Sequence, residues 1–269
     1  MLTQTRPLCF ALILVASPAF AQDPLDDALS HRVLTGWTQS DGTQMAAIEL
    51  ILAPGWKTYW RSPGDAGIPP QFTWQGARNL QDVQVHWPSP GIFWESGMRS
   101  VGYKNTVVLP LTVDPKREGE DIKLKGRMLL GICSDICVPI TLDIDTTLPS
   151  LSSDRTPGIV AALANLPFSA QEAGVTDATC RIRPTENGLA VQADITMPSA
   201  GDTEDAVIEA PLPGVWVSEA KTERVGDQLT ITAEMMQQTG EAFAINRSDI
   251  RITVIGGRHT VDIQGCTGS

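Results

Sequence analysis

The sequence predicts an all-β protein built from two β-sandwich domains. Short runs of alternating apolar and polar residues recur along the chain between Gly, Pro, Asn and Asp, and this period of two is typical of strands. Few segments carry a helical period. Residues 22–269 number 248, more than a single domain usually holds, which favours two domains.

The first 21 residues are predicted to be an export signal. Arg6 precedes an apolar run over residues 8–16, and Ala19-Phe20-Ala21 matches an A-x-A cleavage site. A buried helix is the alternative interpretation. No later stretch approaches the roughly 18 unbroken apolar residues of a membrane span. We therefore expect cleavage after Ala21 and a soluble periplasmic protein.

The mature chain is acidic. With Arg6 removed it carries 19 basic and 31 acidic residues, a net charge of −12. This balance argues against nucleic acid or an anionic membrane as a partner, because both would repel it. The solubility of an exported protein is enough to explain the charge.

The first domain is expected to span residues 22–148, followed by a linker rich in Ser and Pro at 149–157. The second domain, 158–269, is expected to begin with a short helix at 158–166, and Gly256-Gly257 is predicted to be a two-residue hairpin turn. Besides the hairpin described next, the expected strands are 45–52, 83–87, 107–113, 180–182, 189–195, 229–233, 250–255 and 260–263.

Residues 122–144 predict a β-hairpin with Cys133 and Cys137 at its tip. Alternate positions are apolar on both sides of the tip, so the cysteines fall on the face opposite the apolar stripe. The apolar positions are Ile122, Leu124, Met128, Leu130 and Ile132 before the tip, and Ile136, Val138, Ile140, Leu142 and Ile144 after it.

A three-residue loop at 134–136 would set the register of this hairpin. Apolar residues then face apolar residues and opposite charges face each other, which supports the register independently. The facing pairs are Cys133 with Cys137, Ile132 with Val138, Arg127 with Asp143, and Lys125 with Asp145. Two sulfurs are thus predicted to lie side by side at an exposed tip.

The remaining cysteines, Cys180 and Cys266, are predicted to form a structural disulfide, since export places them in an oxidising compartment. A bridge that closes 87 residues stabilises by about 4.6 kcal/mol, whereas one that closes five residues gives about 2 kcal/mol before strain. Cys133–Cys137 is therefore expected to be the more easily reduced pair. A small structural disulfide is the alternative for that pair.

Several motifs surround the hairpin in a fixed order. They are GWKTYWRSPGDAGIPP at 55–70, WPSP at 87–90, Gly102-Tyr103, Leu109-Pro110, and Cys133-x3-Cys137-Val138-Pro139. This order resembles the N-terminal periplasmic domain of the thiol:disulfide interchange protein family DsbD, and more closely its ScsB-like relatives from copper-tolerance systems. The resemblance covers roughly residues 30–148. The short cysteine spacing also fits the ScsB-like branch better than DsbD itself.

The resemblance implies an immunoglobulin-like first domain that relays electrons. It would take them from a membrane carrier (DsbD/CcdA-like) and pass them to periplasmic thioredoxin-like proteins. Cys137 would form the mixed disulfide with the partner, and Cys133 would resolve it. The chain holds neither a membrane segment nor a thioredoxin domain, so we expect the carrier to be a separate polypeptide. The alternative is that the relay function is not retained.

The resemblance also implies a cap loop over the cysteines, and the matching stretch is 89–99. Its candidate residues are Phe93, Trp94, Glu95 and Met98. Tyr59 and Trp60 are candidates to line the same pocket. For all of these apolar residues, ordinary core packing is the alternative interpretation.

Three carboxylates could lie near the sulfurs, namely Asp65, Glu95 and Asp135. A carboxylate beside a thiol raises its pKa and can relay protons, although such loop residues are more often simply solvated. Lys123 and Arg127 share the cysteine face, but they lie too far along the strand to act on Cys133.

Two other functions remain open. Cys133, Cys137 and Met98 could bind Cu(I), because thiolate and thioether ligands suit this ion. The sandwich could also be a non-catalytic binding or chaperone module. No resident metal or other cofactor is expected, since the three histidines are scattered, no phosphate loop is present, and thiol–disulfide exchange needs no cofactor.

Overall fold

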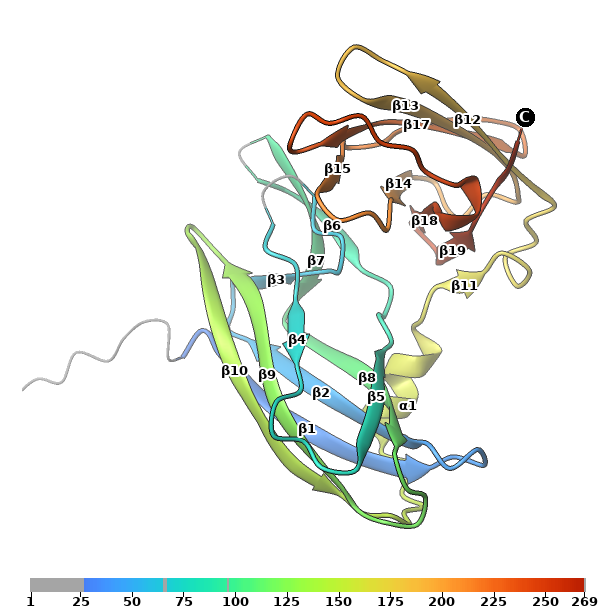
Figure 1. Cartoon of the computed structure of the whole chain (residues 1–269). Coiled ribbons are helices and arrows are strands. Elements are labelled where there is room, and N and C mark those ends of the chain that lie inside the picture. The colour runs from blue at the N-terminus through green and yellow to red at the C-terminus, as the bar shows by residue number, and fades with distance from the viewer. Residues whose placement is uncertain (1–26, 65–66, 96, 269) are drawn as a thin grey trace, which may run out of the picture.

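Four β-sheets form two sandwiches, one above the other in Figure 1, which confirms the predicted all-β class. The computed structural model describes residues 27–64, 67–95 and 97–268. The predicted signal peptide and Asp65 lie outside the described residues. Within the described ranges, no helix is long and apolar enough to cross a membrane.

The first sandwich packs a four-stranded sheet against a six-stranded one. The four-stranded sheet has the order β1 (Leu29–Thr38), β2 (Gln44–Leu52), β8 (Thr106–Pro115), β5 (Leu80–Val85). The other has the order β10 (Cys137–Leu148), β9 (Ile122–Cys133), β3 (Lys57–Tyr59), β7 (Met98–Lys104), β6 (Gly91–Glu95), and β4 (Gln71–Thr73) also pairs with β9. Apolar side chains from both sheets, such as Ile48 and Leu130, fill the space between them.

The register of the β9–β10 hairpin agrees with the sequence prediction. Cys133 is the pairing partner of Cys137, and the same register continues to the far end of both strands. Arg127 faces Asp143, and Lys125 faces Asp145 with an ion pair of 3.4 Å. The even-numbered residues of β9 are buried in the core, so both cysteines lie on the opposite face.

The predicted linker at 149–157 runs along the first sandwich and is tied to β1. The backbone N–H of Thr38 donates to the carbonyl of Ser152 (2.8 Å), and the Ser152 hydroxyl donates to the carbonyl of Gly36 (2.6 Å). Helix α1 (Pro157–Ala164) follows, near the predicted position, and buries Ile159 against Trp37. We infer that the first domain extends through α1 rather than ending at residue 148.

The second sandwich also pairs a four-stranded and a six-stranded sheet. The first has the order β11 (Phe168–Ser169), β19 (Thr260–Gln264), β18 (Arg251–Gly256), β14 (Glu204–Glu209). The second has the order β15 (Val215–Val217), β17 (Gln228–Gln237), β13 (Leu189–Thr196), β12 (Asp177–Pro184), β20 (Thr267–Gly268), and β16 (Lys221–Val225) pairs with β17. A short 3₁₀ helix, η1 (Arg247–Asp249), precedes β18. The predicted Cys180–Cys266 disulfide is present, with a Cα–Cα distance of 5.6 Å.

The turn between β18 and β19 lies one residue later than predicted. Ile255 pairs with Thr260, and the backbone N–H of Gly256 donates to the carbonyl of His259 at 3.0 Å, so the turn is centred on Gly257-Arg258 rather than on Gly256-Gly257. The carbonyl of Ala200 accepts hydrogen bonds from the backbone N–H groups of Arg258 (3.0 Å) and His259 (3.3 Å). A side chain at Gly256 would overlap the backbone of Ala200. The neighbouring segment therefore determines the shape of this turn, and local sequence does not show that contact.

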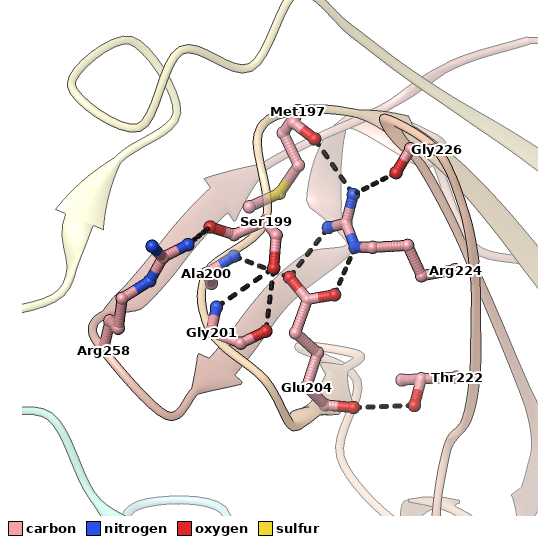
Figure 2. A network of polar contacts seen from close by, with 9 residues as sticks. All are labelled: Met197, Ser199, Ala200, Gly201, Glu204, Thr222, Arg224, Gly226 and Arg258. Carbon is pink, nitrogen blue, oxygen red and sulfur yellow. Dashed lines mark hydrogen bonds and ion pairs between the residues drawn. The ribbon is translucent and has the colours of Figure 1, made fainter.

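A largely buried ion pair between Glu204 and Arg224 holds that neighbouring segment (Figure 2). Glu204 Oε1 accepts from the backbone N–H of Ala200 at 2.7 Å, and Arg224 also donates to the carbonyl of Met197 at 3.0 Å. Arg258 donates to the carbonyl of Ser199 at 2.7 Å. The polar network thus satisfies the backbone groups of a loop that packs under the turn.

Two arginines of the first sandwich reach the second. Arg61, just after β3, forms two hydrogen bonds with the carboxylate of Glu209, at 3.0 and 2.8 Å. Arg99, on β7, donates to Asp205 at 3.3 Å and to the carbonyl of Ala206 at 3.2 Å. Bidentate arginine–carboxylate pairs fix orientation as well as distance. Arg99 lies near the tip of the β6–β7 hairpin, so the tip end of this hairpin is fastened to the second sandwich, which lies beside it in Figure 1.

Candidate functional site

A pocket of about 630 Å³ opens beside the Cys133–Cys137 disulfide. Its walls come from β3, from the β6–β7 hairpin, and from the tip of the β9–β10 hairpin. Its ionisable and redox-active side chains are those of Lys57, Tyr59, Glu95, Arg99 and Asp135, together with the two cysteines. The fold thus gathers residues from three distant parts of the sequence around one disulfide.

The two cysteines differ sharply in exposure. Cys133 is the last residue of β9 and is 4% exposed. Cys137 is the first residue of β10 and is exposed, with a Cα–Cα distance of 4.1 Å between the pair. Their tip loop is closed by a hydrogen bond of 3.1 Å from the N–H of Ser134 to the carbonyl of Ile136. An incoming molecule therefore meets Cys137 first.

Tyr59 contacts Cys137 directly. The hydroxyl lies 3.3 Å from Cys137 Sγ, and because a disulfide sulfur carries no hydrogen, the hydroxyl is the donor. The ring lies over Gly131, where a Cβ would be too close to it. Burial raises the pKa of Tyr59, and the carboxylate of Glu95 raises it further. The phenol thus keeps its proton at neutral pH.

The predicted cap loop is mostly a β-hairpin, formed by β6 and β7, which we call the cap hairpin (residues 91–104). Two of its four candidate residues, Glu95 and Met98, line the cysteine pocket. Trp94 does not, and it is 58% exposed. Phe93 does not line the pocket either, and the amine of Lys104 lies 4.4 Å from its ring centre. Because side chains alternate along a strand, Trp94 and Glu95 point to opposite faces.

The expectation that Trp60 lines the pocket is wrong. Trp60 is 0% exposed and belongs to the core of the first sandwich. It follows Tyr59 in the sequence, and since Tyr59 faces the cysteines, its neighbour points the other way. Among the candidate carboxylates, Glu95 and Asp135 line the pocket, and Asp65 lies outside the described residues.

Sequence reasoning missed Lys57. This residue is the pairing partner of Cys133 across β3 and β9, and it is 4% exposed. Its amine donates to Glu95 Oε2 at 2.5 Å and to the hydroxyl of Ser100 at 3.2 Å, both on the cap hairpin. The sequence did hold one indication of its position. Lys57 stands two positions before Tyr59, and alternate residues of a strand share one face, so Lys57 lies on the same face of β3 as Tyr59.

Fold and site together define a two-sandwich protein with an accessible disulfide beneath a β-hairpin. Residues 30–149 match the family model described as "Thiol:disulfide interchange protein DsbD, N-terminal". This match confirms the resemblance drawn from the order of the sequence motifs. That part of the chain is a domain of the thiol–disulfide interchange type.

The whole chain also resembles a solved structure. The N-terminal periplasmic domain of ScsB from Proteus mirabilis is similar to it with a TM-score of 0.69 and 23% sequence identity. The likeness covers 93% of this chain and 97% of that domain, so both sandwiches take part in it. No curated protein matches the chain in sequence. The ScsB-like arrangement of the fold is thereby confirmed.

Proposed function

We propose that this chain is a periplasmic thiol–disulfide exchange protein that reduces thioredoxin-like partners through Cys133 and Cys137. The observation that carries the proposal is the asymmetry of the pair, in which Cys137 is exposed beside a pocket and Cys133 is buried behind it. The family match over residues 30–149 supports the chemistry. The description of the similar ScsB domain as periplasmic supports the compartment.

The exchange runs in two steps from the reduced protein. The Cys137 thiolate attacks a disulfide of the partner, forming a mixed disulfide and releasing one partner thiolate. The Cys133 thiolate then attacks Cys137 Sγ, which forms the Cys133–Cys137 bond and releases the second partner thiolate. Two electrons pass to the partner, whose thiolates take protons from water. A separate membrane carrier (DsbD/CcdA-like) would reduce the protein again.

The surroundings of the pair suit a protein partner. Ile136 on the tip loop and Met98 on the cap hairpin are among the exposed large apolar residues, and Met98 lines the cysteine pocket. Exposed apolar groups that cluster around one site favour docking of another protein. Tyr59 can donate its hydrogen bond to a thiolate at Cys137 as it does to the disulfide sulfur.

Stopped-flow mixing of the reduced protein with an oxidised thioredoxin-like protein tests the proposal. We expect two electrons to be transferred per molecule, and we expect Cys137→Ser to abolish the transfer. Ser134→Ala changes the same loop without removing sulfur, and it should retain the wild-type rate. A Cys137→Ser protein that reduces the partner at the normal rate would end the proposal.

Cu(I) binding is a second candidate, because Met98 lines the same pocket as both cysteines. Two thiolates and a thioether form a soft ligand set that suits this ion. Titration of the reduced protein with Cu(I) against a competing chelator tests this function. An affinity equal to that of the Cys133→Ser, Cys137→Ser double variant would exclude it.

A further inference from the structure

Three residues form a row across neighbouring strands at the floor of the pocket. Lys57 on β3 pairs with Cys133 on β9, and Cys133 pairs with Cys137 on β10. Residues directly opposite in antiparallel strands share one face, with Cβ atoms about 4.5–5.5 Å apart. A lysine thus occupies the position next to the buried cysteine, on the side away from the exposed one.

The charge of Lys57 is removed from water and is held by the cap hairpin. Its side chain is almost fully buried, and its amine bonds to Glu95 and Ser100. Burying an ammonium group is costly unless an opposite charge lies close by. Glu95, which is 44% exposed, supplies that charge from the end of β6. The ammonium is therefore paired through a residue that solvent or a partner can reach.

When the disulfide is reduced, the thiolate of Cys133 becomes a second negative group that the ammonium of Lys57 can stabilise. Cys133 is buried, and burial disfavours a thiolate, which makes a buried thiol a poor nucleophile. Resolution of a mixed disulfide nevertheless requires the thiolate of Cys133 to attack Cys137 Sγ. A cation in the adjacent row position would offset the cost of forming that thiolate.

We propose that Lys57 is a positioning residue for electron transfer, whose ammonium stabilises the Cys133 thiolate in the reduced protein while Glu95 competes for the same charge. The inference rests on the proposed exchange function and deepens it. A partner that draws Glu95 towards itself on docking leaves the charge of Lys57 to the sulfur. The resolving attack then forms the Cys133–Cys137 bond and expels the partner's thiolate, which takes a proton from water.

The other titratable groups of the pocket do not replace Lys57. Glu95 on β6 and Asp135 on the tip loop are carboxylates that oppose a thiolate. Arg99 on β7 lines the pocket but directs its guanidinium to Asp205 and to the carbonyl of Ala206. Tyr59 on β3 donates to Cys137 rather than to Cys133. Lys57 is thus the cation placed for Cys133 among the described lining residues.

The pH dependence of Cys133 alkylation tests the proposal without any partner protein. The Cys137→Ser variant leaves Cys133 as the one thiol of the pair, and the rate of its reaction with iodoacetamide is followed by mass spectrometry of its peptide. The variants to compare in this background are Lys57→Met, Lys57→Arg, Glu95→Gln and Lys104→Met. Lys104 is the matched control, because it pairs with Lys57 one strand further from the sulfur.

We expect Lys57→Met to slow alkylation at pH 7 by about threefold and to move the rate profile to higher pH. A nearby opposite charge changes the thiolate fraction by roughly tenfold, and the greater nucleophilicity of a more basic thiolate returns about threefold of this. Lys57→Arg should restore most of the rate. Glu95→Gln should move the profile to lower pH, and Lys104→Met should leave it in place.

An unchanged profile for a folded Lys57→Met protein would overturn the proposal, and so would a failure of Lys57→Arg to restore it. If Lys57→Met does not fold, Glu95→Gln decides, because a profile that this change does not move contradicts the competition for Lys57. The measurement uses a small alkylating agent. A protein that shows the expected shifts but reduces no thioredoxin-like protein would therefore refute the proposed function and leave this inference standing.

Discussion

The hydroxyl of Tyr59 lies 3.3 Å from Cys137 Sγ and donates a hydrogen bond to it. The two residues are far apart in the sequence and meet because β3 lies beside β9 in the same sheet. A phenol with a raised pKa remains a donor throughout the neutral range, in the oxidised and the reduced protein alike. Tyr59 thus gives the exposed sulfur a fixed polar partner within an otherwise open pocket.

Tyr59→Phe should slow the attack of Cys137 while the fold stays intact. A hydrogen bond of this kind contributes about 1 kcal/mol, which lowers the thiolate fraction roughly fivefold. The greater nucleophilicity of the more basic thiolate returns about twofold of this, so we expect roughly a twofold lower rate of Cys137 alkylation at pH 7. The ring contact with Gly131 is retained, so the melting temperature should change little. The rate is measured in the Cys133→Ser background, and an unchanged rate would show that the hydroxyl does not act on the thiolate.

Arg99→Met should loosen the cap hairpin. The change removes the bonds from β7 to Asp205 and Ala206, and Asp205 is exposed enough to be hydrated, so the loss of stability should be modest, about 1 kcal/mol. Hydrogen–deuterium exchange over residues 91–104 should become faster. Arg32→Met, which removes an exposed ion pair with Glu49, serves as the control and should leave this exchange unchanged. Equal protection of residues 91–104 in the Arg99→Met and Arg32→Met variants would show that the Arg99 contacts do not hold the cap hairpin.

Mild reductant should open Cys133–Cys137 while Cys180–Cys266 stays closed. The first bridge spans four positions and has one exposed sulfur-bearing residue, whereas the second spans 86 positions and includes the fully buried Cys180. The longer loop stabilises by about 2.5 kcal/mol more, which corresponds to some 50 mV for two electrons. Differential alkylation across a glutathione series measures the order. Simultaneous opening of both bridges would contradict the division between an exchangeable and a structural pair.

His86 should make the protein less stable as the pH falls through about 6.5. Burial lowers the pKa of His86 in the folded state, where its ring lies 2.7 Å from the hydroxyl of Thr112. Above that pH both states hold a neutral ring. Below it the unfolded chain binds a proton that the folded chain does not, so unfolding becomes easier. His86→Gln should therefore lose less melting temperature than the wild type between pH 7.5 and 5.5.

The same melting series with His259→Gln controls for the loss of a histidine elsewhere in the chain. We expect this variant to follow the wild-type pH dependence. If His86→Gln and His259→Gln reduce the pH dependence equally, the effect does not come from the burial of His86.

The hairpin could be predicted from the sequence because its determinants are local. Alternating apolar residues set the faces of β9 and β10, and facing charges such as Arg127 with Asp143 set the register. The Cys180–Cys266 pairing followed from elimination and loop length. In each case the physical cause, side-chain period or chain entropy, can be read from the residues themselves.

The rest of the site depends on which strands become neighbours. Nothing near Lys57 in the sequence shows that β3 pairs with β9, and only this pairing puts a buried ammonium beside Cys133. The assignment of Trp60 to the pocket failed because one residue's shift along a strand reverses the face. The turn after Gly256 was predicted one residue too early, because its position depends on a contact with Ala200. Long-range packing decided each of these features.

Trapping of the mixed disulfide tests the central claim most directly. Reduced Cys133→Ser protein is mixed with an oxidised thioredoxin-like protein, and the product is separated under non-reducing conditions and mapped by mass spectrometry. Without a resolving thiol, a covalent complex through Cys137 should accumulate, and Cys137→Ser should give none because the buried Cys133 cannot reach the partner. Equal trapping through Cys133, or a cross-link through Cys180 or Cys266, would contradict the account.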